Sequence, residues 1–196
     1  MSGYPDVLLS ICLGIGLSAA CGFRIFVPFL VMSFAALHGY LHLSSGFAWI
    51  GTWPALWTFL TAAIVEVAAY HIPWLDHALD TIAGPVAVVA GALTMASSIT
   101  DMDPFMKWTL AIIAGGGAAA LTQSTTMLAR GVSTVLSGGI GNPAVATAEA
   151  VAAAVLSMLA IALPLLAGLV VIGIALFAIR KLMQRMQRKK TAPINK

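Results

Sequence analysis

The chain has 196 residues, of which 60% are hydrophobic and only 9% are charged, and its mean hydropathy is +0.98. These values exclude an ordinary water-soluble domain and indicate an integral membrane protein. Because one membrane span needs about 20 apolar residues, the length predicts an all-α polytopic membrane helix bundle of about six to seven spans. It leaves no room for a separate soluble domain.

The charge is distributed unevenly along the chain. Seven of the ten Lys and Arg residues fall within 180–196, whereas the rest of the chain carries three basic and seven acidic residues. The positive-inside rule therefore places this end in the cytoplasm. We divide the chain into a transmembrane helical domain, 1–183, and a basic cytoplasmic tail, 184–196. The tail is expected to contact anionic lipid and, lacking stacking or base-reading groups, to bind no nucleic acid.

The first apolar block, 7–43, is too long for one span. Gly22 and Pro28 interrupt it, so we predict a helix that ends near residue 21, a break, and a second helix at about 26–38. The N-terminus has no basic segment or cleavage site, which predicts no cleavable signal peptide.

Later spans are predicted at about 54–70, 81–99, from 105 to 130, and within the apolar block 144–179. A polar link, 71–80, and a glycine-rich loop, 131–143, would separate them. Pro164 lies near the middle of the last block, which is too long for one straight span. It predicts a tight helical hairpin, with a long kinked helix as the alternative.

Arg24, in "GLSAACGFRIFVP", is the most unusual residue for a membrane segment. An arginine at mid-membrane costs about 2.5 to 3.5 kcal/mol on insertion scales and remains charged. It must therefore pair with an acid such as Glu66 or Glu149, or face an aqueous cavity as an anion or counter-ion site. The small residues before it form a ridge for close helix packing, within the chain or between copies.

Other polar residues complete the candidate site. Glu66 and Glu149 are candidate proton or cation carriers, and the alternative role for each is ion pairing. Gln123 should face protein or water rather than lipid. Asn142 is expected to cap the helix that begins at Pro143. The candidate substrate or ion-binding residues are Arg24, Glu66, Gln123, Arg130, Asn142 and Glu149.

Few other chemistries are indicated. The link 71–80 contains two His and two Asp residues, but a solvated turn is a simpler interpretation than a metal site, and we predict no metal and no cofactor. The stretch 138–149 lacks the spacing and the Lys of a nucleotide-binding loop. Cys12 and Cys21 are too far apart on one helix for a disulfide. No nucleophile, base and oxyanion arrangement is evident, so we expect no enzyme.

An order of Ser, Arg, Glu and Ala-Gly occurs twice along the chain. Ser18 and Arg24 precede Glu66 and the Ala-Gly pair at 83–84, and Ser124 and Arg130 precede Glu149 and the pair at 167–168. Such an order suggests an inverted repeat, as found in many transporters. Coincidence in an alanine-rich chain is the favoured explanation.

Four strings in this order, "GLSAACGFRIFVP", "DTIAGPVAVVAGAL", "LAIIAGGGAAALTQ" and "GNPAVATAE", are similar to the bacterial integral membrane proteins of domain-of-unknown-function family 4126. The resemblance covers about residues 5–185 and implies a polytopic membrane protein without supplying an activity. Members often carry an acidic residue after the position of Glu149, where this chain has Ala150. This difference weighs against a paired-carboxylate role at this helix.

We therefore predict a small transporter or channel, working as a homodimer in the bacterial inner membrane. Its cavity, near the membrane midplane, would be lined by Arg24, Gln123 and Glu66 or Glu149. The alternative is a structural or lipid-organising membrane protein in which the same charges form internal ion pairs.

Overall fold

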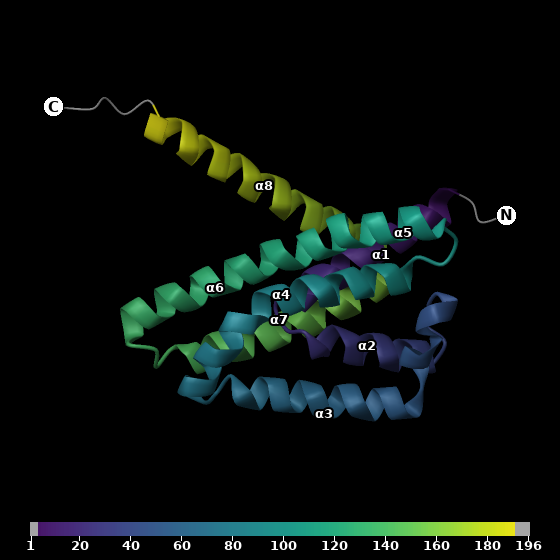
Figure 1. The fold of residues 1–196 in the computed structure, drawn as a ribbon, viewed down its shortest axis with the longest axis horizontal. Coiled ribbons are helices and arrows are strands. Elements are labelled where there is room, and N and C mark those ends of the chain that lie inside the picture. The colour runs from purple at the N-terminus through teal and green to yellow at the C-terminus, as the bar shows by residue number, and fades with distance from the viewer. Residues whose placement is uncertain (1–3, 191–196) are drawn as a thin grey trace.

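Every element in the described part of the computed structural model is helical, as the apolar, alanine-rich sequence predicts. The structure describes residues 4–190, except for the side chains of 4, 5, 73, 74, 76, 77, 178, 179, 182 and 185–190. The elements are α1 (Tyr4–Cys21), α2 (Phe26–Leu37), the short 3₁₀ helix η1 (Ser45–Gly51), α3 (Trp53–Ala69), α4 (Pro73–Ser98), α5 (Pro104–Leu110), the π-helical turn η2 (Ala111–Gly116), α6 (Gly117–Ser137), α7 (Asn142–Ala162) and α8 (Pro164–Lys190). The predicted all-α bundle is confirmed (Figure 1).

The described helices include several that are suited to crossing a membrane. Three segments are long and apolar enough by themselves, and a fourth is reached if η1 and α3, bent by 69°, count as one span; the three are Ala78–Ser98, Pro104–Ser137 and Asn142–Ala162. Three further apolar helices are shorter, at 10–17 residues. These helices indicate a membrane protein. The predicted six to seven spans require the shorter helices to cross as well, and that number stays a prediction.

Helix α1 lies at the centre of the bundle and contacts α4, α6, α7 and α8 (Figure 1). Its small residues permit this close packing. A Cβ atom added at Gly16 would lie 2.7 Å from the Cβ of Ala160 in α7, and one at Gly22, directly after the end of α1, would lie 2.5 Å from the carbonyl oxygen of Ala119 in α6. The small-residue ridge of α1 is therefore occupied by helices of the same chain.

The break between α1 and α2 and the turn at Pro164 both occur as predicted. Helix α1 ends at Cys21, and α2 begins at Phe26. Helix α7 ends at Ala162, and α8 starts at Pro164, whose ring cannot continue the preceding helix. In Figure 1, α8 turns back beside the bundle and then diverges from it, as the predicted hairpin requires and a long kinked helix does not. The predicted domain boundary at residue 183 falls inside α8.

Three local predictions were wrong. Helix α4 begins at Pro73 rather than near residue 81, so most of the polar link is helical. Proline is favoured at the first position of a helix, because the N–H group that it lacks would have no acceptor there. Helix α6 continues to Ser137, where Gly138 and Gly139 end it with φ of 63° and 90°. Asn142 makes no capping hydrogen bond to α7, and Gly141 occupies the N-cap position.

Candidate functional site

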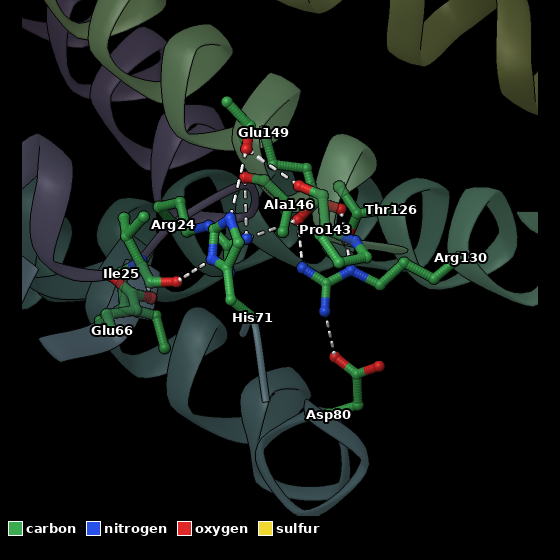
Figure 2. A network of polar contacts seen from close by, with 12 residues as sticks. Arg24, Ile25, Glu66, His71, Asp80, Thr126, Arg130, Pro143, Ala146 and Glu149 are labelled. Carbon is green, nitrogen blue, oxygen red and sulfur yellow. Dashed lines mark hydrogen bonds and ion pairs between the residues drawn. The ribbon is translucent and has the colours of Figure 1, made fainter. Parts of the chain in front are cut away.

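Five charged side chains gather near the end of the bundle where α3 turns into α4 and α6 turns into α7 (Figure 2). Arg24 comes from the α1–α2 break, Glu66 from α3, Asp80 from the first turns of α4, Arg130 from α6 and Glu149 from α7. Arg130 and Glu149 are each about 10 Å along their helices from the α6–α7 turn. The cluster is therefore offset toward one end of the bundle.

Glu149 is shared by both arginines. Its Oε2 lies 3.1 Å from Arg24 Nη2, and Arg130 donates to the same carboxylate through Nε, at 3.0 Å, and Nη2. Arg24 is 1% exposed, and Arg130 and Glu149 are each 5% exposed. A buried charge is tolerated only when it is paired and hydrogen-bonded, and Glu149 provides this pairing for two cations.

The remaining contacts of the two arginines link three more parts of the chain. Arg24 Nη2 also donates to the carbonyl oxygen of Ala146 at 2.9 Å, and Arg130 Nη1 lies 3.0 Å from Asp80 Oδ1. Both guanidinium groups contact the ring of Tyr70, with Cζ 3.9 Å from the ring centroid for Arg24 and 4.2 Å for Arg130. We name Arg24, Tyr70, Asp80, Arg130 and Glu149 the arginine network.

Glu66 has a different role from the other acids. Its two oxygens accept hydrogen bonds from the backbone N–H groups of Ile25 and Phe26, at 2.8 and 3.0 Å. These N–H groups stand at the start of α2, where no preceding turn supplies acceptors and where negative charge is favourable. Within the described part of the chain, Glu66 has no cationic nitrogen within 4.0 Å. Glu66 therefore caps the start of α2 at the α1–α2 break and forms no direct ion pair with Arg24.

The predicted site residues are thus only partly brought together. The structure joins Arg24, Arg130 and Glu149 directly and places Glu66 beside them (Figure 2). Gln123 is buried, as predicted, at 7% exposure, but it lies seven residues before Arg130, or about 10 Å along α6.

Asn142 lies at the first turn of α7. It is seven residues before Glu149, and its Nδ2 donates to Thr134 Oγ1 at 3.2 Å. Measured along the bundle, Gln123 and Asn142 fall on opposite sides of the arginine network, because α6 and α7 run in opposite directions (Figure 1). Neither residue makes one of the contacts that hold the network as described above.

Sequence reasoning missed Tyr70 and left Asp80 out of the candidate site. Asp80 belongs to the link that the sequence predicts to be a turn, whereas the structure places it on helix α4, where it pairs with Arg130. Tyr70 gives no specific signal, because an aromatic residue at a helix end is common near a membrane surface. The tendency of arginine to stack on aromatic rings is the one general clue to its role.

A cavity of about 770 Å³ opens between α3 and α4, with the α1–α2 break as its inner wall. Its lining is apolar apart from Thr58, Thr61, Glu66 and Tyr70. Of the candidate site residues, Glu66 lines this cavity, whereas Arg24 and Glu149 face each other in the network. We call this cavity the α3–α4 groove.

The described side chains include no group of three His, Cys, Asp or Glu residues that could hold a metal ion. Two residues of the link considered for such a site, Asp76 and His77, have side chains outside the described set. Both cysteines are buried and have free thiols, as predicted.

Comparison with known proteins places the chain in a family without giving an activity. No curated protein and no solved structure matches it. A family model described as a domain of unknown function (DUF4126) matches residues 11–184, which is most of the chain. The resemblance seen in the four ordered sequence strings is thereby confirmed, and the chain belongs to the DUF4126 family.

Proposed function

We propose that this protein is a small membrane transporter in which the arginine network is a fixed framework and Glu66 binds the transported species. The observation that carries the proposal is the position of Glu66. This carboxylate lines a groove of about 770 Å³ and also holds the two N–H groups at the α1–α2 break. A ligand that engages Glu66 would therefore act directly on the connection between two helices.

Transport requires two arrangements of the helices, and the break offers a place for the change. Charges and broken helices at membrane depth are common features of solute sites in transporters. Protonation of Glu66, or its pairing with a cation, would weaken its hydrogen bonds to Ile25 and Phe26. That loss would loosen the start of α2 relative to α1, while Asp80, Arg130 and Glu149 continue to hold α4, α6 and α7 together.

The proposal includes the orientation and assembly expected from the sequence. The C-terminal end of α8 and the α6–α7 turn lie on the same side of Figure 1. With the basic tail in the cytoplasm, the network would lie toward the cytoplasmic side of the membrane. A homodimer remains part of the proposal, and we assign the protein no catalytic role.

A structural or lipid-organising role is the second candidate, and one observation favours it. The ion pairs of Arg24 and Arg130 are internal, and each of these two residues is at most 5% exposed. Under this alternative, the charges only fix the fold, and Glu66 is only a helix cap. The two candidates differ in what neutralising Glu66 does to ligand response.

The test is a thermal-shift screen of metabolites on the detergent-purified protein and on two variants. Glu66→Gln retains an acceptor oxygen for α2, and Asp101→Asn removes an exposed carboxylate at the other end of α4. We expect at least one compound to stabilise the wild type and Asp101→Asn but not Glu66→Gln. If no compound does so, or if Glu66→Gln responds as the wild type does, the transporter proposal is wrong.

A further inference from the structure

The shape and lining of the α3–α4 groove indicate which class of compound could bind there. Helix α3 packs mainly on α2 and η1, so the groove separates its other side from α4. The groove opens on the outer surface of the bundle, where Trp57 is 61% exposed and Val86 is 41% exposed. A volume of about 770 Å³ lies within the range of about 300 to 1,000 Å³ that is usual for small-molecule sites.

The charges beside the groove do not balance. Among the side chains that the structure describes there, the two guanidinium groups of Arg24 and Arg130 stand against the three carboxylates of Glu66, Asp80 and Glu149. Asp80 and Glu149 are ion-paired with arginine, whereas Glu66 accepts only the two backbone N–H groups described above. The excess negative charge is therefore located at Glu66, on the wall of the groove.

The rest of the lining suits a large apolar cation. Phe26 and Trp57 supply aromatic rings, which attract cations through the negative faces of their π systems, whereas the ring of Tyr70 is already stacked on two guanidinium groups. A small hydrated ion such as Na⁺ would gain little from such walls, because it requires several oxygen ligands in place of its water. A lipid acyl chain would fit the apolar walls but would bring no positive charge to the Glu66 carboxylate, whose hydrogen bonds come from two backbone N–H groups.

We propose that the α3–α4 groove binds hydrophobic organic cations, with the Glu66 carboxylate facing the positive charge and the aromatic side chains holding the apolar body. This inference rests on the proposed function, because it names the substrate class for the same Glu66 site. It is nevertheless tested by binding alone, without any measurement of transport.

Tetraphenylphosphonium is the probe, used in titration calorimetry with the detergent-purified full chain. We expect saturable binding to the wild type and at least about tenfold weaker binding to Glu66→Gln, which is the factor that a lost interaction of moderate strength produces. The exposed carboxylate variant Asp101→Asn should bind as the wild type does.

A second pair of variants tests the location without altering any charge. Thr61→Trp places a large side chain inside the groove, whereas Ile64→Trp places it on the outer surface of the same helix, where Ile64 is 60% exposed. Binding should be lost in Thr61→Trp and retained in Ile64→Trp. This pair keeps the inference testable even if Glu66→Gln does not fold.

Three results would overturn the inference: equal affinity in Glu66→Gln and the wild type, equal affinity in Thr61→Trp and Ile64→Trp, or equally tight binding of neutral triphenylphosphine oxide. Any of them would mean that the groove takes up apolar molecules without recognising charge, as a lipid-binding surface would. If the metabolite screen still finds a ligand that depends on Glu66, the transporter proposal survives and only the substrate class is wrong. If tetraphenylphosphonium binds as expected but no ligand is transported, the class is right and the transporter proposal fails.

Discussion

Glu149 and Arg24 form one ion pair, but removing them should have unequal effects on stability. Glu149 is the carboxylate shared by two buried arginines, so Glu149→Gln leaves Arg24 with the Ala146 carbonyl as its acceptor and weakens the bidentate contact of Arg130. Arg24→Met, in contrast, leaves Glu149 paired with Arg130. The structure thus predicts an asymmetry between the two partners.

The magnitudes follow from how many charges each change leaves without compensation. Removing one partner of a buried pair costs about 3 to 5 kcal/mol, and we expect Glu149→Gln to fall in this range, because Arg24 loses its carboxylate partner and Arg130 keeps only Asp80. Arg24→Met removes the interactions of one cation but leaves no carboxylate uncompensated, which should cost about 1 to 3 kcal/mol. Methionine also retains much of the apolar stem.

The assay is reversible unfolding of the purified protein in detergent, followed by circular dichroism for the wild type and the two variants. Asp101→Asn, which alters an exposed carboxylate, is the control and should change the free energy of unfolding by less than about 0.5 kcal/mol. An equal cost for both variants, or a larger cost for Arg24→Met, would refute the idea that Glu149 is the shared centre of the network.

Three further predictions concern packing around the network. Gly22→Ala should destabilise the protein by about 1 to 3 kcal/mol, because its Cβ would lie 2.5 Å from both the Ala119 carbonyl oxygen and Thr122 Cβ. Gly84→Ala, with no atom within 4 Å of its Cβ, should be neutral or stabilising by up to about 1 kcal/mol. Comparable unfolding midpoints for the two variants would contradict this packing. Tyr70→Leu should lower stability by about 1 to 2 kcal/mol more than Tyr70→Phe, because phenylalanine keeps the ring against both arginines, and equal denaturation curves would argue against the stacking. Cys12 and Cys21, 6% and 0% exposed, should react with a water-soluble maleimide only after unfolding, and rapid labelling of the native protein, read by mass spectrometry, would be inconsistent with their burial.

Much of the fold was predictable because the membrane limits the alternatives. A long apolar block with Gly22 and Pro28 inside it predicts a broken helix, and Pro164 predicts a hairpin, since both rest on local backbone chemistry. The ends of α4 and α6 were harder to place, because polar residues in 71–80 and 131–137 resemble loop composition although the structure makes them helical.

The candidate site was predictable in its residues more than in its connections. A buried arginine must find a counter-charge, so sequence reasoning could name Arg24, Glu66 and Glu149 together. It could not decide which glutamate pairs with arginine, because that depends on how α3 and α7 pack beside the break. The shared use of Glu149 by Arg24 and Arg130 brings together residues from three separate segments, and one sequence carries no record of that proximity.

The most direct test of the central claim is uptake into proteoliposomes of a ligand found by the metabolite screen. Vesicles would contain the wild type, Glu66→Gln or Asp101→Asn in equal amounts, verified by their protein content. We predict saturable uptake with the wild type and Asp101→Asn, and uptake no faster than in empty vesicles with Glu66→Gln. Uptake that is the same in wild-type and empty vesicles, or that is undiminished in Glu66→Gln, would contradict a transporter that works through Glu66.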